Sequence, residues 1–357
     1  MSTHHRFLAH RSFWPFFLHT AGWCCLFIAA ALGSVWGGMA LFLHAPPTGK
    51  FSHAAVWLWG VAWLLLVGCA LLQKRMVPIL AGGLPLMLGL WIWWASITPQ
   101  ADRAWADDVA QLVNLTPDPQ QPGIVQLNNV RNFQWRSDTD YTPRWETRSY
   151  DLNQLRSVDV VLSYWMGPAI AHTLVSFGFT DGQHVVFSIE IRKEKHEQFD
   201  ALAGFFKQYE MALVAADERD ILAVRTNVRS EQVHLYRISM APSSMRDLFM
   251  AYAQQAEQLR QTPRFYHTLT ANCTTIVWQL ARRIGQALPT DWRLLASGYL
   301  PEYLRDAGAL QSPQPIEVLR AAGNMTERAQ NWQRPAMLDD AGASADFSRH
   351  IRQGWAP

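Results

Sequence analysis

The first 99 residues contain no aspartate or glutamate, and three apolar runs fill most of this segment. The runs lie at roughly residues 17–43, 54–72 and 77–97. Each is close to the about 20 residues that a helix needs to cross roughly 30 Å of hydrocarbon. We therefore predict an α-helical membrane anchor with three transmembrane helices over residues 1–99.

Basic residues set the expected orientation of these spans. Arg6 and Arg11 precede the first span, and Lys74 and Arg75 lie in the short connection between the second and the third. Because basic residues favour the cytoplasmic side, the third span should exit outward, with Lys50 as the contrary charge in the outward loop. This orientation places the C-terminal domain in the periplasm or exterior. We expect a multi-pass protein of the bacterial inner (cytoplasmic) membrane whose C-terminal domain faces the periplasm.

The rest of the chain carries 26 basic and 29 acidic residues, a net charge of −3. A slightly acidic module lacks the concentrated positive face that phosphate binding needs, which excludes a nucleic-acid partner. About 260 residues are enough for one large domain. Proline, glycine and charge distribution indicate a linker with a short helix at 100–123, the domain at 124–311, and a loosely packed C-terminal tail with one short helix at 312–357.

Apolar periodicity in this domain predicts strands first and helices afterwards. The expected elements are strands at 169–179, 184–192, 221–226 and 232–238, then helices at 243–261 and 273–284. The first two strands surround Asp181-Gly182. A two-residue turn there would mix their apolar and polar faces, so the register requires a longer loop or a bulge. Strands followed by helices indicate an α+β fold.

Cys273 is the only cysteine after the anchor, because Cys24, Cys25 and Cys69 all lie within apolar runs. A cysteine in an apolar run usually serves as a small hydrophobe. Cys273 instead stands at the start of a predicted helix, where the helix dipole and unpaired N–H groups favour the thiolate. The alternative is a buried structural cysteine. No zinc-type cysteine and histidine spacing occurs, so we expect no metal and no cofactor.

The residues around Cys273 suggest how the helix begins. Asn272 or Thr270 would cap it, and the backbone N–H groups around Cys273 and Thr274 would be free to bind an oxyanion. A thiol nucleophile needs such N–H donors because negative charge develops on the carbonyl oxygen of the group that it attacks.

A cysteine nucleophile also needs a base, and His172 is the best placed of the histidines in the domain. It lies on a predicted strand whose other face is apolar. Glu190 on the next strand would lie opposite or diagonal to it in an even register, where it would orient the imidazole. His267 is a rival base because it is six residues from Cys273. The alternatives are a structural histidine and a Glu190 that only pairs with Arg192.

The histidine strand precedes the cysteine helix, an order that looks like the permuted papain-like group of enzymes, with an antiparallel sheet and packed helices. Several further runs carry a closer resemblance: Val130–Phe133, Ala171–Thr173 with Ser176–Phe177, Phe187–Glu194, Asp217–Asp220, Arg225–Asn227 with Arg229, and Tyr266 with Asn272–Thr275. As a set they span most of residues 125–285 and resemble the Lnb-type periplasmic domain family, named for bacterial lipoprotein transacylases.

The resemblance implies that Cys273 is the nucleophile and His172 the base. It also implies that four further residues line or support the site: Tyr266, Arg192, Arg225 and Arg229. Without the resemblance, the three arginines would be typical solvated strand charges and the tyrosine a packing aromatic. His267 departs from the family pattern, where a smaller amide such as asparagine is expected.

We therefore expect a membrane-embedded thiol acyltransferase or hydrolase. It would act on a membrane lipid or lipoprotein acyl ester through a Cys–His dyad and a thioester intermediate. One alternative is a cysteine peptidase or amidase that acts on cell-envelope peptides, because the two chemistries differ mainly in the leaving group. The other is a non-catalytic, membrane-tethered binding domain.

Overall fold

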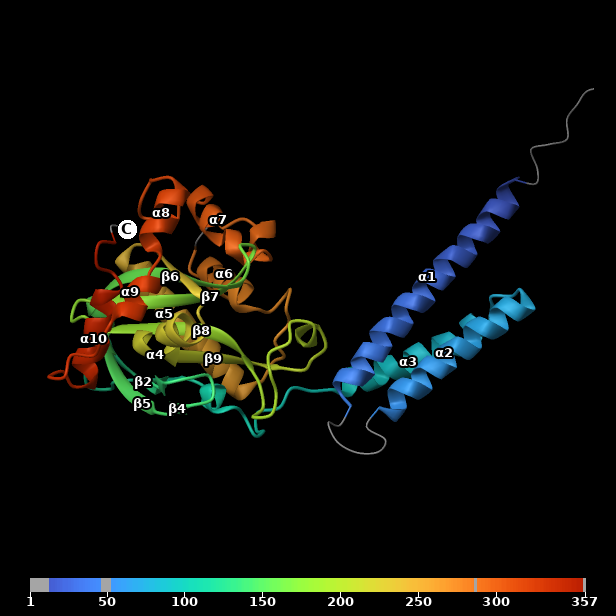
Figure 1. The fold of residues 1–357 in the computed structure, drawn as a ribbon, viewed down its shortest axis with the longest axis horizontal. Coiled ribbons are helices and arrows are strands. Elements are labelled where there is room, and N and C mark those ends of the chain that lie inside the picture. Colours follow the sequence, from blue (N-terminus) through green and yellow to red (C-terminus); the bar gives the residue numbers. More distant parts are fainter. Residues whose placement is uncertain (1–12, 46–52, 286–287, 356–357) are drawn as a thin grey trace, which may run out of the picture. The chain divides into compact units, whose positions relative to one another are not determined.

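The computed structural model describes residues 13–45, 53–285 and 288–355 of the chain. The chain divides into two compact units, Met1–Thr98 and Pro99–Pro357 (Figure 1). Arg6, Arg11 and Lys50, on which part of the predicted orientation depends, lie outside the described residues.

The first unit consists of α1 (Phe13–Leu43), α2 (Ala54–Gln73) and α3 (Val77–Ser96). Within the described residues, these three helices are long and apolar enough to cross a membrane, as predicted. A side chain at Gly37 would place its Cβ 2.4 Å from the indole of Trp59, so glycine allows α1 and α2 to approach closely.

The second unit is built on one large mixed sheet. In spatial order its strands are β1 (Asn114–Pro117), β2 (Ile124–Arg131), β9 (Glu210–Ala216), β8 (His184–Arg192), β7 (Ile170–Phe179), β6 (Leu155–Met166) and β10 (Gln232–Arg237), with β5 (Trp145–Asp151) also paired to β2. Figure 1 shows β9, β8, β7 and β6 side by side. Neighbouring strands are antiparallel except β2 and β9, so the prediction of an antiparallel sheet is corrected to a mixed one.

Helices cover both faces of this sheet, which confirms the predicted α+β class. On one face α5 (Pro242–Gln261) stacks Phe249 and Tyr252 against Phe177 and Phe187, and α6 (Cys273–Arg283) packs beside it against β7 and β8. Successive strand residues point to opposite faces. Accordingly, Ser176 on the other face donates to a carboxylate of α4 (Glu218–Ala223).

One predicted strand pair is wrong. Residues 221–226 form α4 and the π-helical turn η4 (Val224–Val228), and β10 pairs with β6 instead. A short apolar run cannot distinguish a buried strand from a buried helix. Here Asp217 decides the matter, because its carboxylate accepts from the Arg219 N–H and caps the helix.

The two flanking segments also differ from expectation. Residues 100–123 contain β1 and the short 3₁₀ helix η1 (Asp107–Val109), both packed into the domain. The C-terminal segment is not a loose tail with one short helix, because it forms three helices with buried Phe347 and Ile351. The remaining elements are α7 (Leu300–Asp306), α8 (Ile316–Gly323), α9 (Thr326–Asn331), α10 (Asp340–His350) and the small hairpin of β3 (Gln134–Trp135) and β4 (Tyr141–Thr142).

Candidate active site

Asn272 fixes the start of α6 and hence the position of Cys273. Its side-chain oxygen accepts from the N–H groups of Thr274 at 3.0 Å and Thr275 at 2.9 Å, and the Thr275 hydroxyl accepts from the Asn272 N–H at 2.9 Å. This reciprocal capping box places Cys273 at the first helical residue. It also corrects one expectation, because the Thr274 N–H is engaged by the cap rather than free for an oxyanion.

The register of β7 and β8 brings His172 and Glu190 together. The strands pair Leu174 with Ser188 in an even register and are joined by a loop longer than two residues, as predicted. Just beyond that pair, the Nε2 of His172 lies 3.2 Å from a carboxylate oxygen of Glu190. Glu190 therefore pairs with the imidazole, not with Arg192.

Ser188 completes the contact between the two side chains, and the sequence analysis did not identify it. Its hydroxyl lies 2.7 Å from His172 Nε2 and donates to Glu190 at 2.7 Å. The available signal was strand alternation, since Ser188 is two residues before Glu190 and shares its face of β8.

Arg225 holds the carboxylate from the other side. Its guanidinium lies 3.0 Å from Glu190 and 3.3 Å from Glu231, a second buried acid that the sequence analysis did not identify. Burial by itself would raise the pKa of Glu190, but the charges of His172 and Arg225 and the Ser188 hydrogen bond hold that pKa well below its usual value. Glu190 is thus a fixed negative charge beside the imidazole.

The Cys273 thiol is buried at the end of the β7–β8 ladder. Thr173 on β7 and Thr274 on α6 link the helix to the strand through hydroxyl groups 2.8 Å apart. Burial alone would raise the pKa of Cys273. The charge and hydrogen bond of His172, with hydrogen bonds from the Thr173 backbone and the Thr274 hydroxyl, outweigh burial and lower it below the usual value for a thiol.

The pKa of His172 moves in the complementary direction. Burial disfavours the imidazolium, yet the charge of Glu190, helped by Cys273, raises the pKa of His172 to about 9 against the opposing charge of Arg225. The two pKa shifts therefore run in complementary directions, as expected of two groups whose titrations are coupled.

Tyr266 lies close enough to Cys273 and Glu190 for their charges to act on its phenol. Burial and the nearby charges of Cys273 and Glu190 raise the pKa of Tyr266, so its phenol stays protonated. Tyr266 therefore presents a neutral O–H group next to the sulfur.

Three other candidates have their interactions elsewhere. Arg192 donates to the carbonyl of Ala110 at 2.8 Å and stabilises the segment that enters the domain. Arg229 is paired with exposed Asp138 at 3.1 Å. The Nδ1 of His267 accepts from backbone N–H groups of its own loop, so this rival base is engaged locally.

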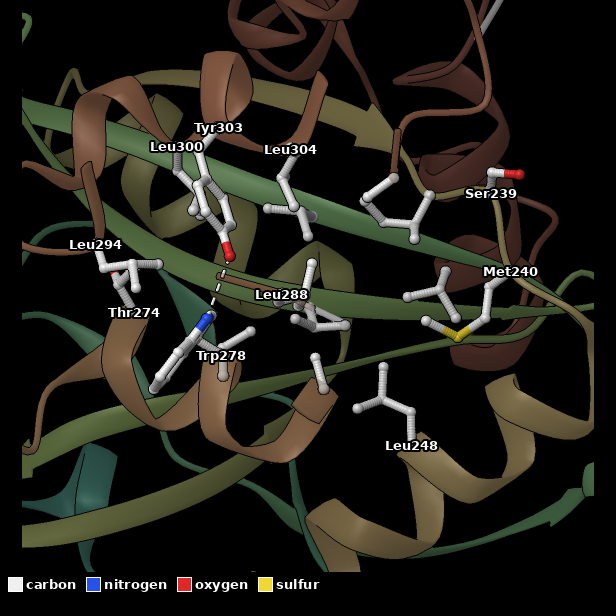
Figure 2. Close-up of a pocket in the computed structure, with 17 residues that line it drawn as sticks. Ser239, Met240, Leu248, Thr274, Trp278, Leu288, Leu294, Leu300, Tyr303 and Leu304 are labelled. Atoms are coloured by element: carbon white, nitrogen blue, oxygen red, sulfur yellow. Dashed lines mark hydrogen bonds between the residues drawn. The ribbon is translucent and has the colours of Figure 1, made fainter. Parts of the chain in front are cut away.

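An apolar cavity of about 70 Å³ adjoins the start of α6 (Figure 2). Thr274 lies at one end of it, and the Sγ of Cys273 is 3.9 Å from the Thr274 hydroxyl. Further walls come from α5, α7, the sheet and the loop between β10 and α5. The Thr274 side chain therefore separates the candidate nucleophile from a partly open hydrophobic cavity.

The charge on Glu190 should control the reactivity of Cys273. In Glu190→Gln the hydrogen-bonding shape is kept but the charge that raises the pKa of His172 is lost, so that pKa falls. With less imidazolium present, the pKa of Cys273 rises. We expect the acid limb of the pH profile for alkylation by iodoacetamide to move up by about one unit, or roughly tenfold slower labelling below the limb.

This alkylation is measured on the full chain with Cys24, Cys25 and Cys69 replaced by alanine, so that only Cys273 reports. Glu257→Gln, an exposed change on α5, serves as the matched control. Superimposable profiles for the two variants would contradict the assignment of Glu190 as the group that sets the charge state of the pair.

Residues 141–298 match the family model described as the Lnb N-terminal periplasmic domain. No curated protein and no solved structure matches the chain. The matched segment includes Cys273, His172, Glu190, Arg225 and Tyr266. The part of the chain that carries this cluster thus matches the model of the Lnb N-terminal periplasmic domain, the family that the sequence resemblance predicted, and it follows three apolar helices of membrane-spanning length.

Proposed function

We propose that the protein is a thiol acyltransferase or hydrolase that acts on acyl esters of membrane lipids or lipoproteins. The observation that carries the proposal is the placement of Cys273 at the capped first residue of α6, in the same cluster as a His172 imidazole whose Nε2 lies 3.2 Å from Glu190. The lowered pKa of Cys273 and the raised pKa of His172 support it. A thiol with a lowered pKa and a specific charge partner at a helix start is typical of a nucleophile.

The first half-reaction forms a thioester. The Cys273 thiolate attacks the ester carbonyl carbon, and the Tyr266 hydroxyl donates to the oxyanion of the tetrahedral intermediate. As the C–O bond breaks, the imidazolium of His172 gives its proton to the departing alcohol. Glu190 stabilises the imidazolium, so the proton remains available until the alcohol leaves.

The second half-reaction regenerates the thiolate. An amine or water attacks the thioester carbon and gives its proton to the neutral imidazole of His172. The C–S bond then breaks, and the sulfur departs as the thiolate that the same imidazolium stabilises. An amine acceptor makes the protein a transferase, and water makes it a hydrolase.

The proposal includes the orientation in the membrane. Lys74 and Arg75 form the turn between α2 and α3, and basic residues favour the cytoplasmic side. This arrangement would send α3 outward and put the Cys273 domain in the periplasm of a bacterial inner membrane, where the acyl donor is confined to the adjacent lipid layer.

Lipid is preferred to cell-envelope peptide as the substrate because of the cavity beside Thr274. Its lining is almost entirely apolar. A peptide substrate would need partners for the polar groups of its backbone, since an unpaired polar group is costly to bury.

The test is mass spectrometry of Cys273 during turnover. The full chain would be placed in vesicles of phosphatidylethanolamine and phosphatidylglycerol, quenched in acid and digested. We expect an acyl adduct on the Cys273 peptide that hydroxylamine removes, as a thioester requires. Product formation without this adduct, or with the adduct equally present in Cys273→Ala, would overturn the proposal.

A further inference from the structure

The loops at one end of the large sheet form a common surface. Strands β6, β7, β8 and β9 are antiparallel neighbours, so the β6–β7 turn and the loop between β8 and β9 leave the sheet at the same end. Trp165 near the end of β6 contacts Phe199 of that loop edge to face, with ring centroids 5.3 Å apart. His172 is the third residue of β7 and Glu190 the third from the end of β8, so this end of the sheet also carries the candidate site.

Two further segments join these loops. The segment that leads into α6 is held by Thr268, whose hydroxyl donates to the Ala201 carbonyl at 3.0 Å. The segment 292–299 is held by the Gly298 N–H, which donates to the Ala169 carbonyl at 3.0 Å. Four segments that are far apart in the sequence therefore meet at one end of the sheet.

These four segments carry most of the large apolar side chains that the domain exposes. In the described part of Pro99–Pro357, only two such side chains lie elsewhere, Val318 and Met337. Exposed apolar residues scattered singly need no explanation, but a gathered set indicates an interaction surface. We call this set the apolar patch, and its members are Trp165, Met166, Phe199, Leu202, Leu269, Trp292 and Leu295.

The polypeptide joins the domain at this same end. The apolar helix α3 ends at Ser96, and the Gln100 N–H already donates to a carboxylate oxygen of Glu210, the first residue of β9, at 2.9 Å. The Ala106 N–H then donates to the carbonyl of Lys193, just past β8, at 2.9 Å. Few residues thus separate a helix of membrane-spanning length from the end of the domain that carries the patch.

The composition of the patch favours a lipid surface as its partner. Tryptophan is enriched at membrane–water interfaces, and Trp165 and Trp292 are 42% and 62% exposed. The exposed charges beside the patch include both signs, such as Lys195 and Asp200. Burial of apolar area, rather than attraction to anionic headgroups, would therefore supply the binding free energy.

We propose that the apolar patch inserts into the headgroup region of the bilayer that holds the three apolar helices. The domain would then rest on the lipid surface with the end of the sheet that carries Cys273 and His172 against the membrane. This inference goes beyond the proposed function, because none of the seven side chains of the patch takes part in the chemistry.

The test measures how deeply single positions lie in the bilayer. The full chain, with its four cysteines replaced by alanine, would receive Leu202→Cys or Met337→Cys, both at exposed positions, and be labelled with bimane. It would be placed in vesicles of phosphatidylethanolamine and phosphatidylglycerol that contain lipids spin-labelled on the acyl chain. We expect at least about twofold quenching at Leu202 and none at Met337, because apolar side chains at an interface lie roughly 5–10 Å into the headgroup boundary.

A second set of variants tests the apolar origin of the contact. Met166→Asp with Leu295→Asp should abolish the quenching at Leu202, whereas Val318→Asp, an exposed change outside the patch, should leave it unchanged. Raising the salt concentration from about 0.1 M to about 1 M should also leave the quenching unchanged, because screening weakens charge interactions only. Unaltered iodoacetamide labelling of Cys273 in the double aspartate variant would show that a loss of quenching does not come from misfolding.

Two results would overturn the proposal: equal quenching at Leu202 and Met337, or quenching at Leu202 by headgroup spin labels alone. Either would leave the patch as a surface for a protein partner. The outcomes are separable from those of the proposed function. Quenching at Leu202 in a protein that forms no thioester would keep the patch and reject the acyl transfer, and a thioester on Cys273 without this quenching would do the reverse.

Discussion

Cys273→Ser should lower acyl transfer or hydrolysis by at least about a thousandfold, because the serine hydroxyl is not ionised by the same imidazole near neutral pH. A loss of this size corresponds to roughly 4 kcal/mol of transition-state stabilisation, at about 1.4 kcal/mol per factor of ten. The substitution removes little volume, so the buried surroundings of α6 should be retained. The measurement is the rate of acyl release from a lipid ester by the full chain in vesicles.

Cys69→Ser provides the matched control for this experiment. Cys69 is an exposed cysteine on α2, so the same chemical change there should leave the rate unaltered. Wild-type turnover by Cys273→Ser, with membrane insertion and unfolding behaviour preserved, would reject Cys273 as the nucleophile and favour a binding domain.

Asp220→Ala should destabilise the domain by about 3–5 kcal/mol, because it leaves a buried arginine without its counter-charge. Asp220 is fully buried and lies 2.9 Å from the guanidinium of Arg131, which is itself 4% exposed. The same carboxylate accepts from the Phe133 N–H at 2.9 Å and the Trp135 indole at 2.7 Å. One truncation therefore leaves four donor groups of three residues without an acceptor.

The measurement is urea-induced unfolding of the full chain in detergent, followed by near-ultraviolet circular dichroism. Asp140→Ala is the matched control, since Asp140 also pairs with an arginine, Arg136 at 2.6 Å, but both side chains are exposed. We expect little change there, as surface ion pairs are screened by water. Equal unfolding midpoints for the two variants would show that burial does not control the strength of the Arg131–Asp220 pair.

Both predictions concern the same sheet, because α4 packs on one of its faces and α6 on the other. Asp220 links α4 to the end of β2 and to Phe133 just after it. The turn η4 continues α4 to Arg225, which contacts Glu190. A partial loss of the Asp220 interactions should therefore weaken Cys273 reactivity as well as stability, which the iodoacetamide assay would detect.

Local patterns accounted for several of the main elements and for part of the candidate site. An apolar run of membrane length forms a helix in the bilayer, because hydrocarbon offers the backbone N–H and C=O groups no hydrogen-bond partner other than those within the helix. Strand alternation placed His172 and Glu190 on one face of the sheet, and an asparagine before Cys273 predicted the helix cap. Each of these inferences depends on residues close together in the chain.

Other features required contacts between distant segments. The apolar run at 221–226 became a helix because Asp217 caps it and buried Asp220 meets Arg131, a residue far away in sequence. The C-terminal segment likewise packs because Arg352 forms ion pairs with Asp159 and Glu218. Composition could not reveal these partners, since a Pro- and Gly-rich segment is equally typical of a linker.

The sequence by itself determined the three apolar helices, the α+β class and the order of histidine strand and cysteine helix, since these follow from local periodicity and chain order. Only the tertiary structure decided that Ser188 and Arg225 meet at Glu190, that Arg192 and Arg229 have other partners, and that an apolar cavity lies beside Thr274. The physical reason is that pKa shifts and cavities arise from side chains converging from separate elements, and no local pattern specifies which of them converge.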